Sequence, residues 1–137
     1  MKVQKIALIS FYDEEGRILL QDRRGMSKYG EEWGFFGGGI EKGETPEEAI
    51  VRETKEELDY DLEDIQYLGN CKSALVDGSC LDCYIFLSPL EGKMKNFRVL
   101  EGNGMKLYSF SEIGKLKLIS ADWEVPNLIY NAIKEQK

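Results

Sequence analysis

The sequence contains no histidine and, among its 137 residues, three prolines and three cysteines. The absence of histidine excludes the commonest zinc ligand. The number of cysteines is odd, whereas a disulfide framework uses pairs, so the sequence does not predict one; the three are Cys71, Cys80 and Cys83. Because structural zinc needs about four ligands and no second cysteine pair exists, we interpret the three cysteines as small, half-buried thiols.

Long apolar runs are also missing. The longest, such as IALISFY and YIFL, fall far short of the roughly 20 residues that a membrane helix needs, and no signal-peptide pattern precedes them. The sequence therefore predicts no membrane association and a cytoplasmic location. Basic residues number 18 against 25 acidic ones, which gives a net charge of −7. This balance argues against binding to duplex nucleic acid, and a polyanionic substrate would need metal cations.

What the sequence does contain is the composition of a compact domain. Hydrophobic residues make up 42% and charged residues 31%, without repeats or low-complexity segments. We predict a single domain over residues 1–137. Stretches rich in β-branched and aromatic residues are interrupted by one central and one terminal helical segment. The predicted fold class is therefore α+β, with a mixed β-sheet packed against helices.

Several strands and turns can be placed from local patterns. VQKIALISFY and RILLQDRR predict a hairpin across DEEG, and IQYLGNCKSAL and SCLDCYIFLSPL predict a second hairpin across VDG. EEWGFF predicts a short strand, after which a glycine-rich loop is expected to run to Thr45. EGKMKNFRVLEGNG is expected to be irregular and GMKLYSF to be the last strand. Ser111 is expected to cap a short helical turn, and Pro126 constrains the start of a terminal helix.

The central helix has the clearest boundaries. Thr45 is a good N-cap, Pro46 suits the first helical position, and Glu48 stands three residues after the cap, where a capping box needs it. We predict a helix from Pro46 to Leu58.

The spacing of residues along this helix separates two faces. Residues three and four apart lie on one side, so an acidic face carries Glu53, Glu56 and Glu57, and a core face carries Val51, Thr54 and Leu58. Like charges at this spacing repel each other, and hard divalent cations prefer clustered carboxylate oxygens completed by backbone carbonyls. The preceding glycines could supply such carbonyls. The alternative is an acidic face that is simply solvated.

The spacing of these residues resembles the Nudix box. From Gly38, five residues lead to Glu44, seven more lead to Arg52-Glu53, and Glu56-Glu57 follow after a gap of two. All six positions match the family pattern, within the phrase GGGIEKGETPEEAIVRE. The chain is therefore similar to MutT-like members of the Nudix hydrolase family, and this resemblance implies an α/β/α sandwich.

Three positions depart from the family pattern. Thr54 stands where an aliphatic residue is usual, Asp59 replaces a glycine after the helix, and Phe36 replaces a proline that many relatives carry. A hydroxyl on the core face weakens packing slightly, and aspartate tolerates left-handed backbone geometry. None of the three removes a chemical group from the acidic face.

The resemblance implies a reaction and its residues. Nudix enzymes hydrolyse a nucleoside diphosphate linked to another moiety, usually with magnesium, and manganese is an alternative ion. The metal ligands implied are Gly38, Glu53, Glu56, Glu57 and Glu101. Glu53 or Glu57 would be the base, Arg52 would orient the carboxylates, and Glu44 would be structural or approach the metals. For Glu101 a solvent-facing role is the alternative, and Glu91 is its rival.

The resemblance also implies substrate contacts at Arg23, Phe35 and Asp122. Arg23 resembles an arginine that meets phosphate, Phe35 could stack on a base, and Asp122 stands where MutT-like members read the purine edge. An exposed charge, a core aromatic and a helix N-cap are the respective alternatives. Length and flanks favour a nucleoside triphosphate, including an oxidised one such as 8-oxo-dGTP, cleaved to monophosphate and pyrophosphate.

Other functions stay open at this point. The substrate could instead be ADP-ribose, a nucleotide sugar or a dinucleoside polyphosphate, or the domain could bind a nucleotide without catalysis. The expected partner is a small-molecule nucleotide, and the sequence is compatible with a monomer or a homodimer.

Overall fold

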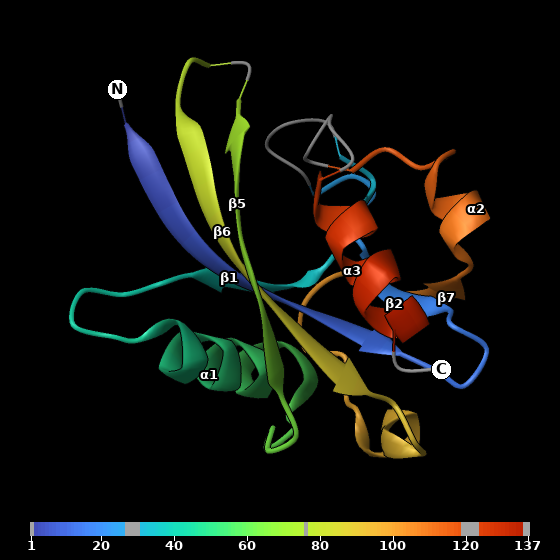
Figure 1. Cartoon of the computed structure of the whole chain (residues 1–137). Coiled ribbons are helices and arrows are strands. Elements are labelled where there is room, and N and C mark those ends of the chain that lie inside the picture. The colour runs from blue at the N-terminus through green and yellow to red at the C-terminus, as the bar shows by residue number, and fades with distance from the viewer. Residues whose placement is uncertain (1, 27–30, 76, 119–123, 136–137) are drawn as a thin grey trace.

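A computed structural model describes residues 2–26, 31–75, 77–118 and 124–135 (Figure 1). Within these residues, seven strands form one mixed sheet with the path β3-β2-β1-β6-β5. The strands are β1 (Val3–Tyr12), β2 (Ile18–Asp22), β3 (Trp33–Gly34), β4 (Phe36–Gly39), β5 (Gln66–Ala74), β6 (Cys80–Pro89) and β7 (Met105–Tyr108). The helices are α1 (Pro46–Leu58), the 3-10 helix η1 (Lys93–Asn96), α2 (Phe110–Ile113) and α3 (Glu124–Glu135).

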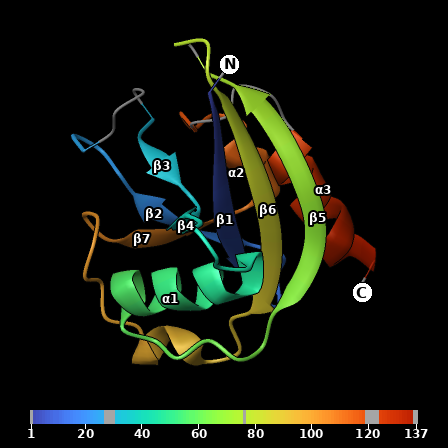
Figure 2. The same ribbon diagram turned by 90° about the vertical axis from the view of Figure 1, so that its left-hand side faces the viewer.

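Helices cover both faces of the sheet. Helix α1 lies on one face, and α2 and α3 lie on the other (Figures 1 and 2). Two apolar clusters fill the two interfaces: Phe11, Phe36 and Ile50 belong to the cluster at α1, and Ile85 and Ile129 to the cluster at α3. This arrangement confirms the predicted α+β fold with a mixed sheet between helices. None of the helices in the described part of the chain is long and apolar enough to span a membrane.

Strand β1 is the centre of the sheet. It pairs in parallel with β6 along its whole length, while its other edge is shared by two antiparallel partners. Residues 6–9 pair with β4, and the last two residues pair with β2, which in turn pairs with β7. The two predicted hairpins, β1–β2 and β5–β6, are both present.

The prediction of a glycine-rich loop that runs to Thr45 is wrong for its first residues, because Phe36–Gly39 form β4. Gly37 has a φ of 137°, and a Cβ added there would collide with the Ala7 carbonyl oxygen and lie 2.9 Å from the Leu8 Cα. Only glycine lets the backbone approach β1 so closely. Because glycine is depleted in ordinary strands, the same residues read as a loop in the sequence.

Helix α1 has the predicted boundaries, Pro46–Leu58. Its capping box is complete: the Glu48 amide donates to Thr45 Oγ1 at 3.1 Å, and the Thr45 amide donates to the Glu48 carboxylate at 2.9 Å. These bonds satisfy two of the amides that every helix start leaves without an intrahelical partner. The helix that carries the acidic face is therefore fixed at its first turn by local interactions.

The three departures from the family pattern are accommodated. Asp59 takes the left-handed conformation, with φ 51°, at the end of α1. Thr54 is fully buried, and its hydroxyl donates to the Ile50 carbonyl at 2.7 Å, so burial leaves it satisfied. Phe36 is buried in the core. One detail of the predicted core face is wrong, because Val51 is 39% exposed and Ile50 takes the buried place.

The segments around α2 also differ from expectation. Ser109, and not Ser111, caps α2: its Oγ accepts from the Glu112 amide at 3.2 Å, while the Glu112 carboxylate accepts from the Ser109 amide at 2.8 Å. The pattern Ser-x-x-Glu is itself a capping-box signal that identifies the cap. The stretch expected to be irregular contains the 3-10 turn η1. Pro126 lies in the first turn of α3, as predicted.

One buried hydroxyl gives a stability prediction. Ser10 is fully buried on β1, and among the described residues its Oγ has no hydrogen-bond partner. Because such a group costs roughly 1–3 kcal/mol, Ser10→Ala is expected to raise the free energy of unfolding by about 1 kcal/mol in urea denaturation. Ser88→Ala is the matched control, since the Ser88 hydroxyl donates to the Asp64 carbonyl and accepts from Lys93. Ser88→Ala should destabilise, and a loss of stability in Ser10→Ala would contradict the prediction.

Candidate active site

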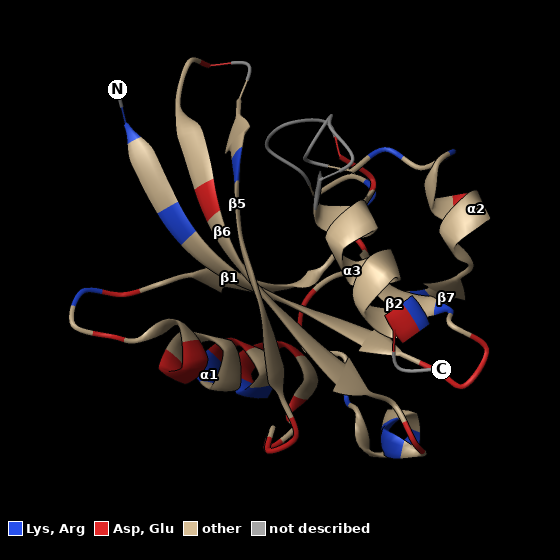
Figure 3. Cartoon of the chain, viewed as in Figure 1, with Lys and Arg blue, Asp and Glu red and all other residues tan. Residues whose placement is uncertain are grey.

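Acidic residues are concentrated on α1 (Figure 3), and carboxylates on and just before this helix share one arginine, Arg52. Arg52 Nε and Nη2 donate to the two carboxylate oxygens of Glu44 at 2.8 and 2.9 Å. Arg52 Nη1 donates to Glu53 at 3.0 Å and to Glu56 at 3.3 Å, and Nη2 also donates to the Gly39 carbonyl at 2.9 Å. One guanidinium therefore joins three carboxylates to the glycine-bearing strand β4.

The Arg52–Glu44 pair stays charged over the whole neutral range. The hydrogen bonds from Arg52, followed by the Glu41 amide, lower the pKa of Glu44 to about 2. Glu44 in turn raises the pKa of Arg52, with Glu53 and Glu56 contributing. The two bonds are parallel and bidentate, which fixes the orientation of the guanidinium.

Glu57 is the buried member of the acidic group. It is 2% exposed, and the Gly37 amide donates to its Oε1 at 2.8 Å. Burial raises the pKa of Glu57 to about 8; the Gly37 hydrogen bond lowers it, the charges of Glu53 and Glu101 raise it, and Arg23 lowers it. Ionised Glu57 therefore lacks enough positive charge around it, which is the electrostatic setting that a cation relieves.

Glu53 stands between α1 and β4. Burial raises its pKa, Arg52 lowers it, and the charges of Glu56 and Glu101 raise it again. A Cβ added to Gly38 would lie 2.6 Å from the Glu53 carboxylate carbon and from its Oε1. The carboxylate thus occupies the space that any other residue at position 38 would fill.

Glu101 reaches the site from a distant segment, residues 98–101. The Arg98 amide donates to the Leu58 carbonyl and the Leu100 amide to the Glu57 carbonyl, both at 2.8 Å. These carbonyls belong to the last turn of α1, where no intrahelical partner exists. The segment is thereby fixed against α1, and the Glu101 charge acts on Glu53 and Glu57.

The rival acidic residue, Glu91, lies elsewhere. It is exposed, follows β6, and acts electrostatically on Tyr12. The placement of the two glutamates therefore favours Glu101 as the additional acidic residue of the site.

The chemistry of the site suits the binding of a hard divalent cation. Its donors are carboxylate oxygens with an adjacent glycine backbone, the ligands that magnesium and manganese prefer. Within the described ranges, no three Asp, Glu or Cys side chains stand close enough to enclose a metal ion in this arrangement. Arg52 holds Glu53 and Glu56 here, so coordination by both would require their carboxylates to turn away from the guanidinium. Buried Glu57, and the Glu53 carboxylate that lies against the Gly38 backbone, fit a cation beside β4.

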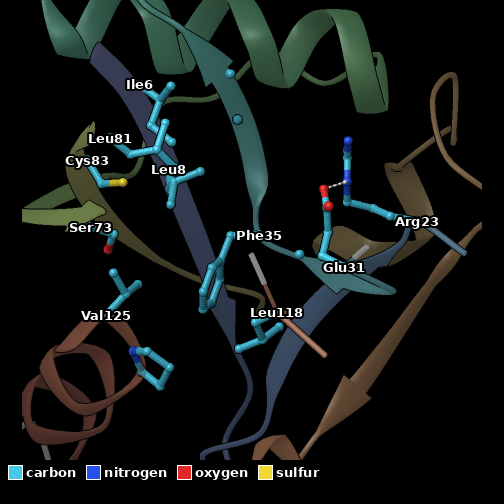
Figure 4. Close-up of a pocket in the computed structure, with 14 residues that line it drawn as sticks. Ile6, Leu8, Arg23, Glu31, Phe35, Ser73, Leu81, Cys83, Leu118 and Val125 are labelled. Atoms are coloured by element: carbon cyan, nitrogen blue, oxygen red, sulfur yellow. Dashed lines mark hydrogen bonds and ion pairs between the residues drawn. The ribbon is translucent and has the colours of Figure 1, made fainter. Parts of the chain in front are cut away.

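A pocket of about 200 Å³ opens beside the glycine strand (Figure 4). Gly37 and Gly38 line it together with Arg23 and Glu31, which form its polar end. Phe35 projects between this end and an apolar part, whose walls include Ile6, Leu8, Leu81, Cys83 and Val125. The same two glycines therefore touch both the acidic group and the pocket.

Arg23 is held at the polar end by two partners. Its Nε donates to the Glu31 carboxylate at 3.1 Å, and its Nη1 donates to Gln21 Oε1 at 2.9 Å. The stem of Arg23 passes over Gly34, where an added Cβ would lie 2.9 Å from Arg23 Cδ. Among the described residues, Nη2 has no hydrogen-bond partner, so it can donate to an anion in the pocket.

The structure brings most of the predicted site residues into two adjoining groups. Arg23 and Phe35 line the pocket, and Asp122 lies outside the described residues. The acidic group beside the pocket consists of Gly38, Glu44, Arg52, Glu53, Glu56, Glu57 and Glu101. Sequence reasoning missed Gln21 and Glu31. Both hold Arg23 in a way that no local pattern indicates.

A glycine-bearing strand, an acidic helix and a pocket thus meet at Gly37 and Gly38 on one mixed sheet. The family model described as NUDIX domain matches residues 1–127. The chain belongs to the Nudix family.

Individual relatives match over shorter lengths. An RNA pyrophosphohydrolase of Marinomonas sp. (strain MWYL1) is 37% identical over 67 residues, 49% of this chain and 39% of the relative. An oxidized purine nucleoside triphosphate hydrolase of Danio rerio is 32% identical over 90 residues, 63% of this chain and 55% of the relative. The chain thus spans about half or less of the length of these curated relatives.

A solved structure matches the whole fold. The crystal structure of MutT protein from Methanosarcina mazei Go1 has a TM-score of 0.76 at 16% identity, covering 99% of this chain and 96% of that chain. At this identity the likeness establishes the fold.

Proposed function

We propose that the chain is a Nudix-type pyrophosphohydrolase that cleaves a nucleoside triphosphate, including an oxidised one such as 8-oxo-dGTP, to monophosphate and pyrophosphate. The observation that carries the proposal is the double role of Gly37 and Gly38, which lie against Glu57 and Glu53 and also line the pocket. A ligand in the pocket would therefore present its phosphates to the acidic group. The name of the Danio rerio relative supports this substrate class.

Each group has a place in the reaction. A bound magnesium or manganese ion supplies neutralisation of phosphate charge and a more acidic water. The groups that would hold it are the Gly38 carbonyl and the carboxylates of Glu53, Glu56, Glu57 and Glu101. Glu53 or Glu57 accepts a proton from the attacking water, whose oxygen bonds to phosphorus as the anhydride P–O bond breaks. Arg52, held by Glu44, orients the carboxylates, and Arg23 Nη2 donates to a phosphate oxygen.

The pocket supports a small nucleotide as the ligand. Its walls are mostly apolar and Phe35 offers an aromatic face, features that suit a flat base. The net charge of −7 disfavours a long polyanion such as an RNA chain. A free nucleotide therefore fits better than an RNA end.

Product analysis tests this proposal directly. The protein is incubated with nucleoside triphosphates, 8-oxo-dGTP, ADP-ribose, nucleotide sugars and dinucleoside polyphosphates, with magnesium or with a chelator. We expect magnesium-dependent release of monophosphate and pyrophosphate from a triphosphate, abolished in Glu53→Gln. A preference for another compound would make that compound the substrate class in place of a triphosphate. Nucleotide binding without turnover would identify a non-catalytic domain.

Asp122 gives a test of base recognition. If Asp122 reads the edge of a purine, as the family resemblance implies, Asp122→Ala should change the ratio of kcat/KM between 8-oxo-dGTP and dCTP. A single lost base contact corresponds to roughly a tenfold change. An equal loss on both nucleotides, together with a lower melting temperature, would point to helix capping instead.

A further inference from the structure

Gln21 occupies an unusual place for an amide side chain. It lies on β2, is 1% exposed, and stands opposite Gly34 of β3 on one side and Met105 of β7 on the other. Burying a side-chain amide costs free energy unless both ends find partners. Its two ends do find partners, and each partner belongs to a different half of the site.

The oxygen end of Gln21 contacts Arg23, which lines the pocket. Its Oε1 accepts from Arg23 Nη1 at 2.9 Å, while Glu31 takes the Nε hydrogen of the same guanidinium. Because Nε and Nη1 are both held, the planar guanidinium has one orientation. Nη2 is then the nitrogen that remains to donate to a phosphate oxygen.

The nitrogen end of Gln21 faces the acidic group. Its Nε2 donates to the Glu101 carbonyl at 3.2 Å. The next residue, Gly102, has φ 85°, and a Cβ added there would lie 2.9 Å from Gln21 Cγ and 3.0 Å from Nε2. The segment that carries Glu101 therefore packs directly on the Gln21 side chain.

The backbone around Gln21 holds the same segment. The Asn103 amide donates to the Asp22 carbonyl at 3.0 Å, and the Asp22 amide donates to the Gly104 carbonyl at 2.9 Å. The position of Glu101 is thus set from β2, by one side-chain bond and two backbone bonds.

We propose that Gln21 is a positioning residue that couples Arg23 on the phosphate side of the site to Glu101 on its metal side. This inference rests on the proposed function, because it gives Arg23 and Glu101 the roles stated above. Only an amide combines an acceptor for the guanidinium with a donor for a carbonyl at this reach. Those two partners also fix which end of the amide is oxygen.

The electrostatics agree with such a coupling. The charges of Arg23 and Glu101 both act on buried Glu57, with opposite signs. Gln21 holds the Arg23 guanidinium and the Glu101 backbone directly. Movement of either partner would alter the field at Glu57.

The coupling is tested by two binding measurements, neither of which requires turnover. One is Mn²⁺ titration of the nucleotide-free protein by electron paramagnetic resonance, which reports the Glu101 side. The other is calorimetric binding of α,β-methylene-dGTP in the presence of a chelator, which reports the Arg23 side. Gln21→Met, which removes both hydrogen bonds at similar length, is expected to weaken each affinity about tenfold.

Double-mutant cycles separate positioning from general damage. In a Glu101→Gln background, Gln21→Met should cause little further loss of Mn²⁺ affinity. In an Arg23→Met background, it should cause little further loss of nucleotide affinity. Leu20→Val, on the same strand and buried in the core, is the control for a comparable loss of stability. Gln21→Asn, which keeps the amide but shortens its reach, replaces Gln21→Met if that variant does not fold.

The outcomes are distinct. Additive effects in both cycles, unchanged affinities in Gln21→Met, equal losses in Leu20→Val, or a wild-type protein that binds neither probe would overturn the coupling. A wild-type protein that binds both probes but hydrolyses no nucleotide would overturn the proposed function and leave the coupling standing.

Discussion

Glu57→Gln is expected to lower metal-dependent hydrolysis by a factor of hundreds to thousands and, at the same time, to stabilise the metal-free protein at pH 8. The loss of activity follows because Glu57 is a proposed metal ligand or general base, and removal of such a group typically costs about 10²–10⁴ in rate. The gain in stability follows from burial, since a glutamine amide in this place has no charge to desolvate.

The pH dependence has a definite sign. Folded Glu57 keeps its proton up to about pH 8, because burial raises its pKa, whereas the unfolded chain releases it near the ordinary glutamate pKa of 4.5. Between these values the folded state binds more protons, so the stability of the metal-free wild type falls as pH rises through this window. The loss is on the order of a few kcal/mol.

Thermal unfolding in a chelator, measured from pH 5 to pH 8, checks this prediction. The melting temperature of the wild type should fall more steeply with pH than that of Glu57→Gln. Glu44→Gln is the control, because Glu44 is already ionised over the whole range. Parallel curves for the wild type and Glu57→Gln would contradict the assignment, as would full activity in Glu57→Gln.

Gly37→Ala is expected to prevent stable folding. The added Cβ would collide with backbone atoms of β1, which no side-chain rotation can relieve, and the φ of 137° is strained for any L-residue. The pairing of β4 with β1 would be lost, at a cost of more than about 4 kcal/mol. Circular dichroism and urea denaturation measure this loss.

The two following glycines provide matched controls with different expected results. In Gly38→Ala the three atoms nearest to the new methyl all belong to the Glu53 carboxylate, which can move, so the fold should survive while Mn²⁺ affinity and hydrolysis fall at least tenfold. In Gly39→Ala no atom of the described residues, apart from the two chain neighbours, lies within 4 Å of the new methyl, so both stability and activity should stay near wild type. Equal behaviour of the three variants would contradict the separate roles of these positions.

The sequence predicts those parts of the fold that depend on neighbours along the chain. Thr45, Pro46 and Glu48 define the start of α1 within four positions, so its boundaries could be predicted. The i, i+3 and i+4 spacing places Glu53 and Glu57 on one side in the same way. Even the missed cap of α2 was encoded locally, at Ser109 and Glu112.

Contacts between distant segments could not be read in this way. Gly37 looks like a loop residue until β1 is known to lie against it. Gln21 reads as an ordinary strand residue, and its contact with Glu101 joins residues 80 positions apart in the sequence. Glu31 reads as a surface acid in EEWG, although its side chain is buried against Arg23. Local patterns contain no signal for these interactions.

The closure of α1 by residues 98–101 has a consequence for the order of folding. The helix start forms from adjacent residues, but its last carbonyls are satisfied by amides that follow far later in the chain. Closing so long a loop carries an entropic cost that local contacts do not. Helix α1 can therefore form before Glu101 joins Glu53 and Glu57, because Glu101 can reach them only when the long intervening segment has closed its loop. A ribosome-bound chain that ends before residue 98 would carry the helix without the completed site.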